Sequence, residues 1–155
     1  MPRTSTRLAA AEGRREGSFR LDDQVGFLLR RAYQRAGANL VERIGIYDLT
    51  PPQFATLARL HEREKISQNL LGRLVGMEPA NIRDVVQRLK RRRLVATERD
   101  PADARQILVR LTPAGLDLVR ELIPVDLECT AKTLAPFTPA ERKLLCDLLR
   151  RLADG

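Results

Sequence analysis

The residues best suited to chemistry in this chain are arginines, and the chemistry they favour is the binding of phosphate groups. Residues 83–110 carry nine basic and four acidic side chains, including the run RLKRRRL, and residues 1–20 carry five basic and two acidic ones. These two segments together account for the formal net charge of +8. A local excess of positive charge suits a polyanion, so the charge pattern predicts nucleic acid as the partner.

Catalytic chemistry finds little support in the same sequence. His61 is the only histidine, and the only two cysteines, Cys129 and Cys146, form no CxxC pair. The chain contains no GxGxxG, P-loop or HExxH motif. We therefore expect no enzyme, no metal site and no cofactor. Because the sequence has no run of eighteen apolar residues and no secretory signal, we also expect a cytoplasmic protein without a membrane partner.

Three Thr-Pro pairs mark the starts of the helices that must position the arginines. Thr50, Thr112 and Thr138 each place a hydroxyl at the N-cap before a proline at the first helical position. Gln53 and Glu141 stand three residues after the first and third threonines, which is the capping-box spacing. Apolar residues at helical period predict a long first helix over about 21–46 and a second over about 51–63.

Two short helical patterns follow between residues 67 and 89. Ser67 caps the first, Gly76 breaks it, and Pro79 starts the second. A helix, a four-residue break and a helix make the helix-turn-helix arrangement. The pattern is weak by itself, because packed helices joined by a glycine turn are common.

A β-hairpin is predicted directly after these helices. Two β-prone stretches, LVATE at 94–98 and QILVRL at 106–111, flank the turn sequence RDPADAR. A lone hairpin is marginally stable, so it must pack on the neighbouring helices, which makes the unit a winged helix. Arg99 and Arg105 then lie at the wing tip, where the potential of a narrow minor groove attracts arginine. Asp100 or Asp103 could hold an arginine there by a paired hydrogen bond. Considered alone, the tip is better explained as a solvated turn of mixed charge.

Three stretches, LTPPQFATLARL, SQNLLGRLVGMEPANIRDVVQRLKRRRLV and DPADARQILVRLTPAG, resemble the MarR family of bacterial transcription regulators over about residues 22–153. The resemblance implies a mainly α fold with a small β-hairpin wing. Its expected parts are a flexible basic tail at 1–20 and a single domain at 21–155, with dimerisation helices at about 21–46 and 112–155 around a winged helix-turn-helix at about 50–111. It also implies a homodimer that binds a pseudopalindromic operator, represses transcription, and releases DNA when a small, often aromatic or phenolic, ligand binds.

Two positions depart from the family pattern. Members commonly carry paired arginines at the wing tip, whereas this chain has Ala104 and then Arg105, so Arg105 must serve with help from Arg99. A glycine usually follows the recognition helix where this chain has Arg93. Left-handed backbone is costly for arginine, so we expect the junction to differ locally.

The expected DNA contacts fall into three groups. Base edges are assigned to Asn81, Arg83 and Gln87, whose side chains offer bidentate patterns. Phosphates are assigned to Ser67, Gln68, Asn69, Arg73 and Arg88. The wing contributes Arg99, Asp103 and Arg105. An architectural protein that binds nucleic acid non-specifically is the alternative function.

Effector binding and dimerisation rest on fewer residues. The candidate ligand residues are Arg31, Tyr33, Phe54 and His61; a packing role is the alternative for His61, and an interface or surface role for Arg31 and Tyr33. The leucines near the C-terminus, including Leu144 and Leu148, exceed what one helix needs against its own domain. They predict a partner subunit, with packing in a monomeric bundle as the alternative.

Overall fold

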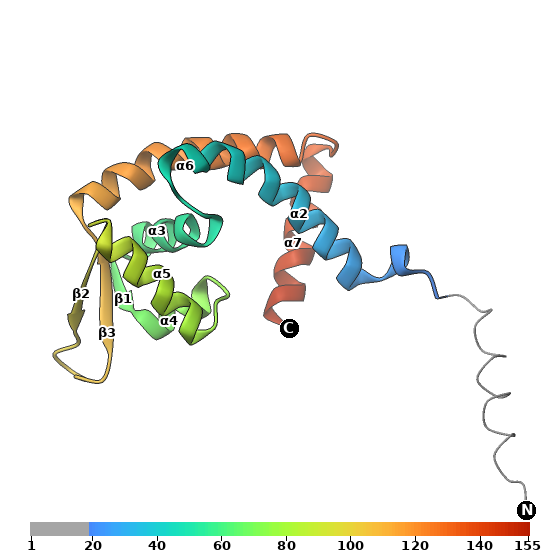
Figure 1. Cartoon of the computed structure of the whole chain (residues 1–155). Helices are drawn as coiled ribbons and strands as arrows, with labels where there is room; N and C mark the ends of the chain where they lie inside the picture. The colour runs from blue at the N-terminus through green and yellow to red at the C-terminus, as the bar shows by residue number, and fades with distance from the viewer. Residues whose placement is uncertain (1–18) are drawn as a thin grey trace, which may run out of the picture. The chain divides into compact units, whose positions relative to one another are not determined.

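A computed structural model describes residues 19–155, and the predicted basic tail lies outside these residues except for its last two. The chain forms two compact units, one up to Gln34 and one from Arg35 to Gly155. Figure 1 labels the helices and strands that they contain. The first contains a short 3-10 helix, η1 (Leu21–Asp23), and the beginning of helix α2 (Val25–Ile44). Within residues 19–155, no helix has the length and apolar character needed to span a membrane.

The predicted first helix over about 21–46 is one helix with a 3-10 turn at each end. Gln24 has extended backbone, with ψ 125°, and its N–H bonds to the carbonyl of Leu21, which separates η1 from α2. After Ile44 the chain tightens into a second 3-10 turn, η2 (Gly45–Tyr47), and Asp48 ends it in the left-handed region at φ 54°. The helix expected over about 21–46 is therefore present, with its α-helical part at Val25–Ile44.

The helix-turn-helix prediction is confirmed. Its three helices are α3 (Pro51–Arg63), α4 (Gln68–Leu74) and α5 (Pro79–Arg91). Thr50 and Gln53 form the expected capping box at the start of α3, and the Ser67 hydroxyl accepts a hydrogen bond from the Leu70 N–H at the start of α4. Gly76 adopts φ +68° in the break before α5, a conformation that glycine reaches without steric cost.

The wing is a three-stranded antiparallel sheet rather than a lone hairpin. Its strands are β1 (Lys65–Ser67), β2 (Val95–Arg99) and β3 (Ile107–Leu111), in the order β1-β3-β2. The predicted hairpin is β2 and β3, with Thr97 opposite Val109. Strand β1 was not predicted from the sequence; it pairs Ile66 with Val109 and joins the wing to the start of α4.

One hydrophobic core joins the three helices to the sheet and to the next helix, α6 (Pro113–Thr133). The side chains buried in it are Ile44, Leu49, Phe54, Leu57, Leu60, Leu71, Ile82, Val86, Leu89, Leu94, Val95, Val109, Val119 and Leu122. Every element from α3 to α6 except β1 contributes a buried side chain to this core, and the half-buried Ile66 of β1 packs against it, so packing fixes α5 relative to the wing.

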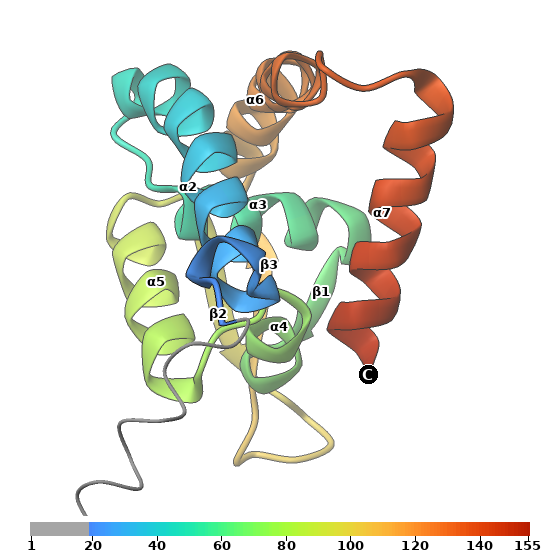
Figure 2. The same cartoon turned by 90° about the vertical axis from the view of Figure 1, so that its right-hand side faces the viewer.

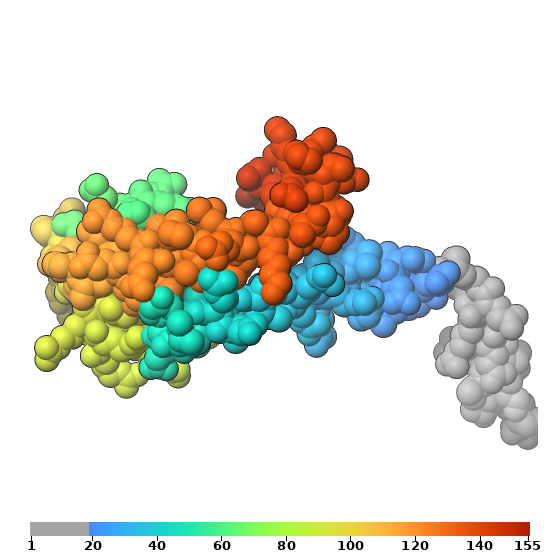
Figure 3. All heavy atoms as spheres, turned by 90° about the horizontal axis from the view of Figure 1, so that it is seen from above, coloured from blue at the N-terminus to red at the C-terminus, as the bar shows by residue number. Residues whose placement is uncertain are grey.

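Helix α6 begins against the wing and then runs beside the second half of α2. Gly115 lies so close to the strand junction that a Cβ there would stand 1.9 Å from the carbonyl oxygen of Leu94. Further along, Asn39 donates to the Thr133 hydroxyl at 3.3 Å and Arg43 pairs with Glu128 at 2.9 Å. Residues 35–44 accordingly lie along α6 (Figure 3).

The last helix, α7 (Pro139–Asp154), starts with the predicted capping box between Thr138 and Glu141. None of its residues is buried, and its leucines at 144, 148, 149 and 152 are exposed. In Figure 2, α7 and α5 lie on opposite sides of α3.

Candidate nucleic-acid interface

Three buried residues set the rotation of α5. Ile82, Val86 and Leu89 face the core. With 100° between successive residues, the side that points directly away from the core carries Ala80, Asp84, Gln87 and Arg91, all of which are exposed. Between the buried and the outer side, α5 has two flanks. Lys90 lies on one of them and donates to the Thr97 hydroxyl of β2 at 2.7 Å, so this flank faces the wing.

The predicted base-reading residues are all exposed but do not share one direction. Gln87 lies on the outermost side, and Arg83 lies on the flank toward the wing. Asn81 and Arg88 turn toward the start of α3, where they line a shallow pocket of about 290 Å³. Asp84 and Arg91 are exposed on the same outer side but were not among the DNA contacts expected from the sequence.

Helix α4 places its candidate phosphate ligands at its first turn and its end. Asn69 and Arg73 are exposed, whereas Gln68 is half-buried. Ser67 is also half-buried and its hydroxyl oxygen accepts the cap hydrogen bond from Leu70, which leaves the hydroxyl proton free to donate.

The wing tip is organised by two arginines. Asp103 accepts a hydrogen bond from the Arg105 Nε at 3.1 Å, so the predicted carboxylate–arginine pairing is present, and this pair lowers the pKa of Asp103. Arg99 donates to the carbonyl of Ala104 at 2.8 Å. The tip therefore presents Arg105, while Arg99 bonds to the tip backbone.

The junction after α5 keeps the left-handed turn despite its arginine. Arg93 adopts φ 59°, so the expected local difference was wrong. Hydrogen bonds compensate for the strain: its N–H bonds to the carbonyl of Lys90 at 2.9 Å, and its carbonyl accepts from the Thr112 hydroxyl at 2.7 Å. The preceding Arg92 donates to the carbonyls of Asp48 and Tyr47 at 2.5 and 2.8 Å, which fastens α5 to the connection before α3.

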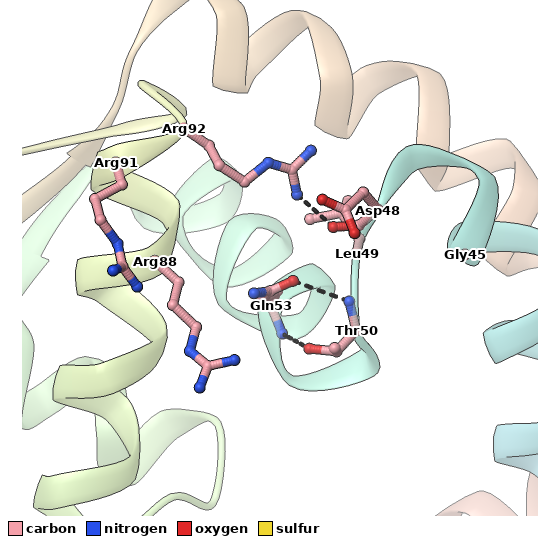
Figure 4. Close-up of a pocket in the computed structure, with 8 residues that line it drawn as sticks. All are labelled: Gly45, Asp48, Leu49, Thr50, Gln53, Arg88, Arg91 and Arg92. Carbon is pink, nitrogen blue, oxygen red and sulfur yellow. Dashed lines mark hydrogen bonds between the residues drawn. The ribbon is translucent and has the colours of Figure 1, made fainter.

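Next to the hydrogen bonds of Arg92 lies a pocket of about 490 Å³, here called the arginine pocket. It is lined by Gly45, Asp48, Leu49, Thr50, Gln53, Arg88, Arg91 and Arg92. Figure 4 shows Arg88 and Arg91 extending from α5 beside the amide of Gln53 at the start of α3. This pocket was not predicted from the sequence, because its walls come from segments more than thirty residues apart.

The candidate effector residues occupy different settings. Phe54 is buried in the core and His61 is half-buried further along α3. In the other unit, Arg31 lies over the ring of Phe27 at 5.8 Å, and Tyr33 is 72% exposed.

Known proteins with the same arrangement are transcription regulators. A family model described as the MarR family matches residues 47–106. The HTH-type transcriptional repressor NicR of Pseudomonas putida is 35% identical over 137 residues, which make up 88% of this chain and 87% of NicR.

Two solved structures extend this likeness to 90% of the chain. BpsR of Bordetella bronchiseptica, whose DNA binding is regulated by 6-hydroxynicotinic acid, is 40% identical, with a TM-score of 0.85 over 90% of this chain and 99% of BpsR. PcaV of Streptomyces coelicolor, solved in complex with its natural ligand, is 34% identical, with a TM-score of 0.81 over 90% of this chain and 98% of PcaV.

Proposed function

The chain belongs to the MarR family of transcription regulators, and we propose that it is a homodimeric repressor that leaves its operator when a small aromatic acid binds. The recognition helix α5 enters the major groove, and each wing reaches the flanking minor groove. The observation that carries this proposal is the rotation of α5, which buries its apolar stripe and leaves a row of polar side chains for base edges.

The polar row supplies both kinds of readout partner. Gln87 suits adenine, and Arg83 on the wing side suits guanine. The Asp84 carboxylate accepts hydrogen bonds and would be repelled by DNA phosphates. Its favourable partner in the major groove is the amino group of cytosine, which donates. At the tip, Arg105 serves the minor groove, where its pairing with Asp103 limits its rotamers.

Dimerisation is supported by α7. Leu144 and Leu152 are 57% and 56% exposed although the helix is amphipathic, so its apolar stripe meets no partner within the described chain. A second copy covers such a stripe, and a twofold dimer matches a pseudopalindromic operator. We expect half-sites one helical turn apart, roughly 34–36 Å.

The effector class is proposed from the relatives and from the candidate ligand residues. BpsR responds to 6-hydroxynicotinic acid, a hydroxylated heteroaromatic acid. Arg31 offers a cation for a carboxylate and Tyr33 an aromatic face, and Phe54 and His61 remain proposed ligand residues with them. The acid must prefer a dimer conformation that fits the operator poorly, because only a difference in affinity shifts an equilibrium.

Fluorescence anisotropy tests this proposal. The full chain is titrated into labelled DNA from upstream of its own gene and into a scrambled sequence, each with and without 6-hydroxynicotinic acid. We expect tighter binding to the upstream DNA and release by the hydroxylated acid, with benzoic acid as the control that lacks the hydroxyl and the ring nitrogen. Equal affinity for both DNAs would instead favour the architectural alternative.

A further inference from the structure

We propose that the arginine pocket seats a phosphate group of the DNA backbone, next to the groove that α5 enters. This inference rests on the proposed function, because it requires α5 to be the recognition helix. It adds Gln53 and Arg91 to the DNA-binding surface and gives Arg88 a defined place in it.

Gln53 provides the first argument. Its side-chain Oε1 accepts the N–H of Thr50 at 3.0 Å in the capping box, which fixes the orientation of the amide. The Nε2 group has no hydrogen-bond partner among the residues that the structure describes, although Gln53 is only 7% exposed. Because no buried side-chain nitrogen or oxygen lacks a partner among the described residues, this Nε2 is part of the exposed fraction of Gln53. It opens into the pocket (Figure 4), where its N–H groups are available to an acceptor that enters from outside.

The arginines provide the second argument. Among residues 19–155, neither Arg88 nor Arg91 forms an ion pair or a side-chain hydrogen bond. Arg92 is occupied by two backbone carbonyls and forms a wall of the pocket. The lining holds one acid, Asp48, so the pocket is net positive.

These groups select the chemistry of the occupant. Gln53, Arg88 and Arg91 offer donors, so the pocket fits an oxyanion with several acceptor oxygens. The backbone amides at the start of α3 add little: Pro51 and Pro52 have no N–H, and the N–H of Gln53 is bonded to Thr50. Side chains must therefore hold the anion.

The location favours DNA phosphate over a free anion. Arg91 lies on the outermost side of α5 together with Gln87, so the pocket opens beside the surface proposed to face the groove. A backbone phosphate at this site would fix the register of α5 without reading sequence.

Gln53→Glu tests the anion site without removing the helix cap. Glutamate keeps an acceptor oxygen for Thr50, as Glu141 does for Thr138, but replaces the amide donor with a negatively charged oxygen. We expect an unchanged or higher melting temperature, and a Kd raised at least about tenfold on operator and scrambled DNA alike, since like charges then face each other.

Arg91→Gln tests the guanidinium, with Arg63→Gln as its matched control. Arg63 is an exposed arginine at the other end of α3, outside the pocket. We expect Arg91→Gln to reduce the slope of log affinity against log salt by about one unit on both DNAs, and Arg63→Gln to leave it unchanged.

Two outcomes would overturn the inference. In one, Gln53→Glu and Arg91→Gln bind both DNAs with wild-type affinity and salt slope. In the other, Arg91→Gln keeps wild-type DNA binding but no longer responds to 6-hydroxynicotinic acid, which would assign the pocket to the carboxylate of an effector. A wild-type chain without preference for its operator would defeat the repressor proposal alone, because the phosphate contact is still measurable on scrambled DNA.

Discussion

Helix α3 of the winged helix and the C-terminal helix α7 both begin with a Thr-Pro capping box, but they differ in how much of their surface is buried. Thr50 with Gln53 and Thr138 with Glu141 both form complete capping boxes. Helix α3 then buries five residues, whereas α7 buries none. Local sequence therefore decides that a helix forms, and tertiary packing decides what stabilises it.

This difference separates two kinds of stability in one chain. The core that holds α5 and the wing lies within one chain, and Ile44 of α2 with Val119 and Leu122 of α6 complete it. Helix α7 exposes its apolar stripe within the described chain, and in the proposed dimer a second subunit buries this stripe. Changes in the first region should act on folding, and changes in the second on assembly.

The largest effect is expected at the contact between α6 and the wing. Gly115→Ala would place a Cβ 1.9 Å from the Leu94 carbonyl oxygen, which cannot move without disturbing the strand junction. We expect a loss of about 3 kcal/mol or more in the free energy of unfolding, measured by urea denaturation. Gly37→Ala is the control: its Cβ would meet nothing within 4 Å, and a gain of about 0.5–1 kcal/mol is expected there. Equal stability of the two variants would contradict the close contact.

The next effect should fall on assembly. Leu148→Asp removes an exposed apolar side chain from α7 and adds a charge. Each buried leucine contributes about 1.5–3 kcal/mol and a twofold interface contains it twice, so the dimer dissociation constant should rise roughly hundredfold or more. Sedimentation velocity measures the change. In the matched variant Leu57→Ala, a fully buried residue of the winged helix, unfolding should be the main defect, at about 2–5 kcal/mol. A Leu148→Asp chain that stays dimeric at micromolar concentration would remove α7 from the interface.

The parts of the fold that follow from local rules were predictable from the sequence. Thr-Pro caps, helical periodicity and the glycine break at Gly76 located α3 to α7 closely, because each depends on neighbours within a few residues. Strand β1 was not predictable in this way. Its three residues carry almost no pattern, and they form a strand only because Ile66 pairs with Val109, more than forty residues away.

In the candidate site too, the features that depend on local sequence were predictable and those that depend on tertiary contacts were not. Exposure of Arg83 and Gln87 and the pairing of Arg105 with Asp103 followed from periodicity and short spacing. The arginine pocket did not, because it exists only once Arg92 has fastened α5 to the connection before α3. The left-handed Arg93 was misjudged for a similar reason: the carbonyl bond from Thr112 is a tertiary contact.

Substitutions in the winged helix should weaken DNA binding without affecting the dimer, which is the reverse of the effect expected in α7. Arg83→Ala should cost about 1–3 kcal/mol of binding free energy on the operator and less on random DNA.

Arg105→Ala should weaken binding to the operator and to other AT-rich DNA alike and lower the slope of log affinity against log salt by about one unit. Anisotropy titrations at several salt concentrations measure both, and sedimentation should show that both variants remain dimers. If Arg105→Ala binds both DNAs as the wild type does, the wing tip is only a solvated turn.

The smallest effect should separate the two capping boxes by pH. Hydrogen bonds from Thr138 lower the pKa of Glu141, so the carboxylate is favoured in the folded helix. A lowered pKa means that this contribution is complete above the ordinary value of 4.5 and is lost as pH falls through the lower folded value. The first turn of α7 should therefore loosen in acid, whereas the box of α3, built with the neutral amide of Gln53, should not change. Amide hydrogen exchange at Glu141 and Gln53, compared between wild type and Glu141→Gln over this pH range, measures the difference. The variant should lose the pH dependence at α7 while other acid effects remain, and identical pH profiles in both chains would show that the Glu141 carboxylate does not stabilise the start of this helix.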